Sequence, residues 1–264
     1  MFNGYPPSQS GYVWLVGAGP GAIDLITMRG RQALAHAEVV LYDDLANSEL
    51  LEICAAGTEF IHVGKRAGRH SAPQDEINRL LVAHARAGRR VVRLKGGDPT
   101  VFGRLGEEVQ ALRSAGIAFE VVPGVTAACA AAAAAGVSLT QRGLASAAVL
   151  VTGHECVGKA GPALDWQTLA QTGATVCVYM GTRSLGALAT QLLSAGRQPD
   201  TPLLIVCHAS LPSQTIHAGT LESAAELVRD IQDTPALILI GTIAVHNRPD
   251  NATPAHVDEP AYAG

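Results

Sequence analysis

Three glycine-rich segments follow short apolar runs, and each carries residue types suited to binding a small polar ligand. The first is Val-Gly-Ala-Gly-Pro-Gly-Ala at 16–22, the second has Lys-Gly-Gly-Asp at 95–98, and the third begins Val-Gly-Lys-Arg at 63–66. Glycine permits positive φ and lets a ligand approach the backbone closely. A fourth segment, Val-Pro-Gly-Val-Thr-Ala-Ala at 122–128, leads from a turn into a predicted helix with Thr126 as its N-cap.

Positive charge is concentrated between residues 61 and 104. Ten Lys and Arg stand there against three acids, although the 264-residue chain has a net charge of −4. These charges either lie on solvated helix faces or line a cleft for a ligand with several negative charges. Arg66, Arg69 and His70, beside Lys65, have the chemistry to bind carboxylates. The acidic overall balance and the 4% aromatic content disfavour a nucleic-acid surface.

The first glycine loop also supports a different interpretation. Gly17, Gly19 and Ala22 match the dinucleotide fingerprint G-x-G-x-x-[GA], and Asp43 follows the next predicted strand, close to where a ribose-binding acid would stand. Pro20 weakens this interpretation because it removes an N–H that a pyrophosphate would use. The sequence has no Walker A pattern GxxxxGK[ST], which disfavours ATP hydrolysis.

The elements that must position these segments alternate between strand and helix, which predicts α/β architecture. We predict strands at 13–16, 38–42, 59–63, 90–94, 118–122, 148–152, 175–179, 203–207 and 237–241. We predict helices at 27–37, 48–55, 73–87, 103–114, 126–135, 166–171, 184–194 and 221–231. Ligands in open α/β sheets bind outside the carboxyl ends of strands, which is where the glycine segments fall.

A polar stretch at 138–146 divides this pattern into two predicted domains, 12–140 and 145–246, with flexible tails at 1–11 and 247–264. The five cysteines form no CxxC pair, which favours free thiols in a reducing cytosol and a cytoplasmic protein. His154 and Cys156 alone are too few for a metal site, so we expect no metal. The apolar runs are too short to span a bilayer, so we expect no membrane partner.

Taken together, five segments resemble the tetrapyrrole methylase family, in order and with similar spacing, between residues 13 and 245. They are VGAGPGAIDLIT, YDDL, VGKRAGRHSAPQDEIN, VRLKGGDPTVFGR and PGVTAA. The third and fourth look most like the branch that methylates uroporphyrinogen III. The resemblance implies a two-domain class III methyltransferase fold, an active site in the interdomain cleft, and a homodimer. It also implies S-adenosylmethionine as methyl donor, which leaves as S-adenosylhomocysteine.

The resemblance further implies roles for individual residues. The implied donor-binding residues are Pro20, Gly96, Gly97, Asp98, Val101, Thr126, Ala127, Met180 and Ala209. Asp43 matches the proton acceptor of the family and Lys65 the proton donor. The implied tetrapyrrole-binding residues are Arg66, Arg69, His70 and Phe102. The implied reaction is methylation of uroporphyrinogen III at C2 and C7, which gives precorrin-2 through precorrin-1 for sirohaem, cobalamin or haem d1.

Several alternatives stay open at this point. They are a methylase of a later precorrin, a methylase of protein or ribosomal RNA, a nicotinamide oxidoreductase, and a ligand-binding module without catalysis. Two positions also depart from the family pattern. Leu105 stands where glycine is usual, and we expect it to narrow the cleft near Phe102. Cys207-His208-Ala209 replaces an acidic residue, a polar residue and glycine, which bears on the expected role of Ala209.

Overall fold

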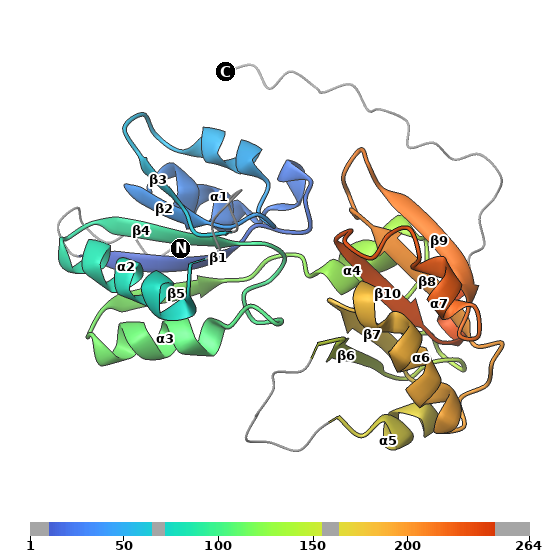
Figure 1. Cartoon of the computed structure of the whole chain (residues 1–264). Coiled ribbons are helices and arrows are strands. Elements are labelled where there is room, and N and C mark those ends of the chain that lie inside the picture. Colours follow the sequence, from blue (N-terminus) through green and yellow to red (C-terminus); the bar gives the residue numbers. More distant parts are fainter. Residues whose placement is uncertain (1–10, 65–71, 155–163, 246–264) are drawn as a thin grey trace.

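The computed structural model describes residues 11–64, 72–154 and 164–245. Two five-stranded sheets, each covered by helices, follow one another along the chain (Figure 1). The predicted α/β architecture is confirmed. Lys65, Arg66, Arg69 and His70 lie outside the described residues, as does Cys156.

The first sheet is entirely parallel, with strand order β3-β2-β4-β1-β5. Its strands are β1 (Tyr12–Gly17), β2 (Val39–Tyr42), β3 (Glu59–His62), β4 (Arg90–Lys95) and β5 (Ala118–Val122). All five were predicted, with ends that differ by one residue at most. Because the strands run in parallel, their carboxyl ends meet at one edge, and the loops that leave this edge carry the glycine segments.

Helices cover both faces of the first sheet, which explains why its inner strands β1 and β2 are continuously apolar. On one face α2 (Gln74–Arg86) and α3 (Leu105–Ser114) bury a cluster that includes Leu15, Leu41 and Leu81. On the other face α1 (Met28–Ala35) and the 3₁₀ helix η2 (Ser48–Ile53) bury Leu34, Leu50 and the ring of Trp14. The short 3₁₀ turn η1 (Ile23–Leu25) precedes α1.

The second sheet is mixed, with strand order β6-β7-β10-β8-β9. Its strands are β6 (Ala148–Thr152), β7 (Thr175–Tyr179), β8 (Pro202–Cys207), β9 (Thr215–Thr220) and β10 (Ala236–Ile240). Only β6 and β7 pair in parallel, while the other three pairs are antiparallel. One face is covered by α5 (Trp166–Gln171), α6 (Leu185–Ser194) and α7 (Ala224–Leu227). The turns η3 (Thr182–Ser184) and η4 (Thr242–Ala244) follow β7 and β10.

Two sequence expectations in this half were wrong. The edge strand β9 was not predicted, because its sequence Thr-Ile-His-Ala-Gly-Thr contains only one β-branched apolar residue. β9 forms because it pairs with β8 in an antiparallel hairpin, which stabilises a strand that its own residues favour only weakly. The helix predicted at 221–231 is reduced to the four residues of α7. The Ser223 hydroxyl accepts a bond from the Thr220 amide at 3.0 Å, which favours a turn at this start.

The alanine-rich helix α4 (Ala127–Ala134) connects the two sheets, as Figure 1 shows. It follows the last strand of the first sheet, yet its buried face packs on the second sheet. Ala128, Ala131 and Ala132 lie in one apolar cluster with Leu204 and Leu239. Methyl side chains allow this close approach of helix and sheet. The division of the chain at 12–140 and 145–246 stays a prediction. α4 belongs to the first of these segments, but the side chains on which it packs belong to the second.

Candidate functional site

Three loops at the carboxyl edge of the first sheet are in direct backbone contact. The amides and carbonyls of Gly19 and Gly97 exchange two hydrogen bonds, at 3.2 and 2.7 Å. A Cβ atom on Gly17 would lie 2.6 Å from the Gly97 oxygen, and one on Gly124 would lie 2.3 Å from that oxygen. Glycine is therefore required where the loops after β1, β4 and β5 meet.

Gly97 differs from these neighbours because one side of it is open. Its φ is +67°, and a Cβ atom built there would meet nothing nearer than the Ala127 amide nitrogen, at 4.0 Å. This nitrogen is the first amide of α4, where a helix presents the positive end of its dipole. We call the open side of Gly97 together with the start of α4 the cradle. Apart from the Ala127 nitrogen, no heavy atom outside Gly97 and its chain neighbours lies within 4 Å of that Cβ position.

Asp98 uses its carboxylate to hold this arrangement together. Its Oδ2 accepts a hydrogen bond from the Gly124 amide at 2.9 Å, and its Oδ1 accepts from the amide of Thr100 at 2.7 Å. The Thr100 hydroxyl also donates to Oδ1. Asp98 therefore ties the loop after β4 to the loop between β5 and α4. Gly96 is packed as tightly, since a Cβ atom there would lie 2.5 Å from the Leu45 Cβ atom.

Asp43 follows β2 at the same edge and is held from two sides. Its Oδ2 accepts from Nη2 of Arg93 at 2.8 Å, and its Oδ1 accepts from the Leu45 amide at 3.2 Å. Its side chain is 25% exposed. Because Leu45 packs on Gly96, the Asp43 loop and the glycine loop after β4 form one surface.

Beneath Asp43 lies a network of buried charges. Arg93 and Lys95 of β4 point to the face covered by α2 and α3, and each is 4% exposed. Glu108 of α3 is fully buried and binds both, with Oε1 at 3.2 Å from Arg93 Nε and Oε2 at 2.7 Å from Lys95 Nζ. Burial lowers the pKa of Lys95, and the Glu108 carboxylate opposes that shift.

The second sheet reaches the site through Tyr179, the last residue of β7. Its hydroxyl bonds to Oγ1 of Thr126 at 2.6 Å and accepts from the Ala128 amide at 3.1 Å. Its ring centroid lies 5.0 Å from that of Phe102. Burial raises the pKa of the Tyr179 hydroxyl. The next residue, Met180, has φ +52° and a 59% exposed side chain.

A second contact between the halves comes from the loop that joins β8 and β9. The Ala22 amide donates to the Ser210 hydroxyl oxygen at 3.0 Å. A Cβ atom on Gly21 would lie 2.7 Å from Leu211 Cγ, so this loop packs directly on the first glycine loop. Ala209 lies between His208 and Ser210, which both have positive φ. Pro20, Met180 and Ala209 therefore lie on loops that tertiary contacts bring together.

Tyr179, Ser210, Arg93 and Glu108 were not predicted as site residues, although Arg93 and Glu108 stand within or beside the second glycine segment. The available signal was the occurrence of two charges, Arg93 and Lys95, beside the apolar residues Val91, Val92 and Leu94 in the interior of a strand. Such charges require a buried acidic partner. Leu105 packs at the start of α3 against the apolar cluster below the sheet. Its expected effect on the cleft near Phe102 stays a prediction.

The segment with Lys65, Arg66, Arg69 and His70 is bounded by described residues at the same edge. The Ala72 amide donates to the Val63 carbonyl at 3.2 Å, next to the carboxyl end of β3. His62 Nε2 lies 2.9 Å from Asp44 Oδ1, and a Cβ atom on Gly64 would lie 2.6 Å from Asp44 Oδ2. Of the described residues that flank this segment, Gly64 therefore lies beside Asp44 and Ala72 lies beside Val63.

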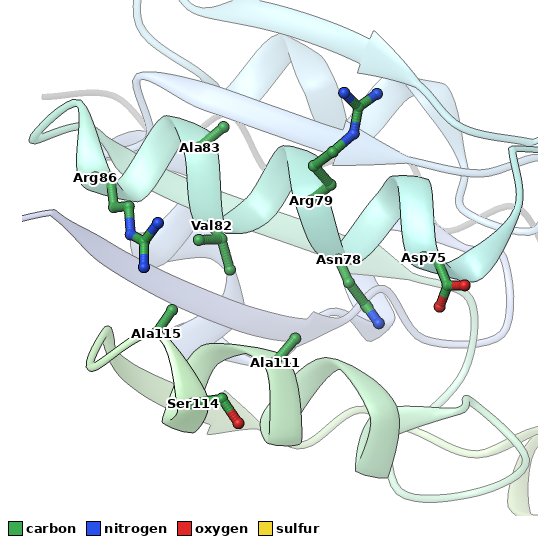
Figure 2. Close-up of a pocket in the computed structure, with 9 residues that line it drawn as sticks. All are labelled: Asp75, Asn78, Arg79, Val82, Ala83, Arg86, Ala111, Ser114 and Ala115. Carbon is green, nitrogen blue, oxygen red and sulfur yellow. The ribbon is translucent and has the colours of Figure 1, made fainter.

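A separate groove of about 500 Å³ lies between α2 and α3. Asn78, Val82 and Arg86 point from α2 toward α3, where Ala111 and Ala115 form the opposite wall (Figure 2). None of the glycine loops lines this groove. Within the described part of the chain, no group of three His, Cys, Asp or Glu is arranged to hold a metal ion.

An α/β unit with glycine loops gathered at its carboxyl edge, closed by loops of a second sheet, is an architecture for binding a small ligand. Comparison with known proteins identifies the family within this class of ligand-binding proteins. The family model of the tetrapyrrole (corrin/porphyrin) methylases matches residues 12–225. The chain belongs to this family and has its two-domain α/β fold.

Individual relatives are similar over most of the chain. A uroporphyrin-III C-methyl transferase from Thermus thermophilus, complexed with S-adenyl homocysteine, is 41% identical, with a TM-score of 0.74 over 89% of this chain and 94% of that one. A cobalt precorrin-4 methyltransferase is 30% identical, with a TM-score of 0.79 over 90% and 97%. The siroheme synthase of Zymomonas mobilis is 48% identical over 89% of this chain and 49% of its own. The chain thus spans about half the length of that relative.

Proposed function

We propose that the chain is an S-adenosylmethionine-dependent methyltransferase that methylates uroporphyrinogen III at C2 and C7 and yields precorrin-2 through precorrin-1. The observation that carries the proposal is the cradle at Gly97 and Ala127, closed by the loops around Met180 and Ala209. Family membership and the 41% identical methyltransferase support it. Similarity to siroheme synthases favours sirohaem as the end product.

The methyl donor fits this cradle because a backbone without side chains faces a helix N-terminus there. S-adenosylmethionine supplies a methyl group on a positively charged sulfur. Its carboxylate suits the first amide of α4, that of Ala127, since the Ala128 amide is already bonded to Tyr179. The residues proposed to hold it are Pro20, Gly96, Gly97, Asp98, Val101, Thr126, Ala127, Met180 and Ala209. Asp98 contributes through backbone positioning, because its carboxylate is already bonded to Gly124 and Thr100.

Asp43 is the proposed catalytic carboxylate. In the transfer the pyrrole carbon would form a bond to the methyl group while the methyl–sulfur bond of the donor breaks. S-adenosylhomocysteine then leaves, and the positive charge has passed from sulfur to the ring. A carboxylate held by Arg93 and by the Leu45 amide is preorganised to stabilise that charge. It can then accept the ring proton whose loss restores neutrality. Lys65 is the proposed proton donor.

Uroporphyrinogen III carries eight carboxylates, which accounts for a basic segment in an acidic protein. Arg66, Arg69 and His70 are the proposed partners of these carboxylates. Phe102 is proposed to contact the tetrapyrrole, and its ring is 42% exposed beside Tyr179. Alignment of the ring carbon with the donor methyl is then the main task of the site.

The proposal includes a homodimer located in the cytoplasm, with neither nucleic acid nor membrane as partner. Among the described residues, no helix is long and apolar enough to cross a membrane. Light scattering of the purified protein tests the dimer, since a monomer mass would overturn it.

The deciding experiment is mass spectrometry of the tetrapyrrole after anaerobic incubation with uroporphyrinogen III and S-adenosylmethionine. A gain of two methyl groups with formation of S-adenosylhomocysteine is expected. No gain from a folded protein that binds the donor would favour a second candidate, methylation of a later precorrin. The TM-score of 0.79 to a cobalt precorrin-4 methyltransferase is the observation behind that candidate.

A further inference from the structure

Glu108 is the most deeply buried acid of the described chain that the proposed reaction does not use. It lies on α3, and no part of its side chain is exposed. Its Oε1 accepts from Arg93 Nε at 3.2 Å and from Gln74 Nε2 at 3.4 Å, and its Oε2 accepts from Lys95 Nζ at 2.7 Å. A carboxylate in such a place is retained only when donors satisfy both oxygens.

Arg93 connects Glu108 to Asp43 at the site. Its Nη1 donates to the Leu94 carbonyl at 2.8 Å, and its Nη2 donates to Asp43 Oδ2 at 2.8 Å. With Nε bound to Glu108, each nitrogen of the planar guanidinium has a partner. The plane is therefore fixed, with Glu108 at its inner end and Asp43 at its outer end.

We propose that Glu108 is a positioning residue, which orients the Arg93 guanidinium so that Nη2 holds the Asp43 carboxylate at the catalytic edge. This rests on the proposed role of Asp43. Lys95 has a different role, because it pairs with Glu108 and balances the second of the two negative charges. Two cations and two carboxylates, Arg93, Lys95, Asp43 and Glu108, then leave the network neutral.

The cradle for the methyl donor does not depend on Glu108. The glycine loop after β4 is held by backbone bonds, from Ala18 N to the Lys95 carbonyl at 2.7 Å and between Gly19 and Gly97. Loss of the Glu108 carboxylate should therefore change catalysis and leave donor affinity in place. A merely structural role would change both together, because both would follow the folded fraction.

The test is Glu108→Gln, since this substitution removes the negative charge that Arg93 and Lys95 share and replaces one carboxylate oxygen by an NH2 group, which donates and cannot accept. We expect kcat on uroporphyrinogen III to fall at least about tenfold, with the Kd of S-adenosylhomocysteine unchanged within about threefold by calorimetry. The matched control is Glu38→Gln. Glu38 accepts from Arg90 at the other end of β4, at 2.9 Å from its amide and 3.3 Å from Nε, and its loss should leave both quantities unchanged.

A second variant covers the case in which Glu108→Gln does not fold. Lys95→Met with Glu108→Gln removes one cation together with the carboxylate and keeps the network neutral. We expect this double variant to fold with a higher Tm than the single one and still to show low kcat. Recovery of kcat together with Tm would overturn the proposal, because charge balance alone would then explain Glu108. So would a folded Glu108→Gln protein with wild-type kcat.

An NMR measurement separates this inference from the proposed function. Exchange of the Arg93 Nε proton reports its bond to Glu108 whether or not the protein methylates uroporphyrinogen III. Slow exchange is expected in the wild type and in Glu38→Gln, and fast exchange in Glu108→Gln. Equal protection in all three would overturn the positioning role. Failure of the wild type to methylate the substrate would instead overturn the proposed function.

Discussion

The two halves of the molecule bury different kinds of polar group. Below the carboxyl edge of the first sheet, Arg93, Lys95 and Glu108 are buried as charged side chains. In the second half, the described buried polar side chains are those of Thr175, Thr182 and Thr201. Charges taken out of water hold their partners in defined orientations at a cost in desolvation. The first half thus holds buried charges next to the site, whereas the second half supports the site through apolar packing.

The second half contributes to the site through short contacts across the boundary. The Tyr179 hydroxyl binds the start of α4, and the Ser210 hydroxyl binds the Ala22 amide of the first glycine loop. These are neutral hydrogen bonds of ordinary length, each with a modest net effect. The comparison predicts that substitutions in the charged network have larger effects than substitutions in the second half.

The largest effect is expected from Arg93→Leu. It leaves Asp43 and Glu108 without their shared cation and should lower the free energy of unfolding by about 3–5 kcal/mol, with loss of turnover. Urea denaturation measures the first and product mass spectrometry the second. Arg90→Leu is the control, because Arg90 lies at the amino end of β4 and pairs with a partly exposed Glu38. Equal effects of the two substitutions would contradict the comparison.

Asp43→Asn tests the catalytic carboxylate within the same network. An amide oxygen can still accept from Arg93, so the protein should fold and bind S-adenosylhomocysteine normally. We expect kcat to fall by about 10²–10³, as for loss of a charge-stabilising group. Steady-state kinetics measure this, with Asp165→Asn as control at the N-cap of α5. Unchanged turnover would remove Asp43 from the mechanism.

Gly97→Leu tests the cradle. The side chain would extend into the open side of Gly97, and we expect donor affinity to fall at least about a hundredfold, or about 2.7 kcal/mol. Calorimetry with S-adenosylhomocysteine measures it. Gly116→Leu is matched in backbone strain, with φ +68° against +67°, but has open space around it. Wild-type affinity in a folded Gly97→Leu protein would place the donor elsewhere.

A smaller effect is expected from Tyr179→Phe. Loss of the bonds to Thr126 and Ala128 should weaken binding of S-adenosylhomocysteine about fivefold, equivalent to about 1 kcal/mol. The raised pKa of Tyr179 adds a pH test. Its neutral form is favoured in the folded state, so stability is retained below pH 10 and is lost as the pH rises above that value. The variant should lose less stability in alkaline solution than the wild type, as thermal melts at several pH values would reveal.

The smallest effect is expected in the second half, at Thr175. Its hydroxyl is fully buried and has no partner among the described residues. Thr175→Val should therefore raise the free energy of unfolding by about 1 kcal/mol. Thr201→Val is the matched control, since the Thr201 hydroxyl donates to the Gln198 carbonyl at 2.6 Å and its loss should destabilise. If urea denaturation showed that both substitutions change the free energy of unfolding in the same direction, the unpaired state of the Thr175 hydroxyl would be contradicted.

Local sequence was sufficient for most elements of the fold. Nine of the ten strands begin and end within one residue of their predicted limits, because most of them are short, rich in apolar β-branched residues and bounded by turn residues. The edge strand β9 lacks that pattern and forms through its pairing with β8. α7 is shorter than predicted because a side-chain bond from Ser223 favours a turn over helix at its start.

The sequence by itself determined the fold class, the glycine segments and their place after strands, since these depend on residue type and on neighbours in the chain. Tertiary structure alone decided which groups meet. Asp43 and Arg93 are 50 residues apart, and Ala22 and Ser210 are 188 apart. Strand order and the packing of α4 on the second sheet bring them together. A charge in a strand predicts that a partner exists, but only the folded chain selects Glu108 as that partner.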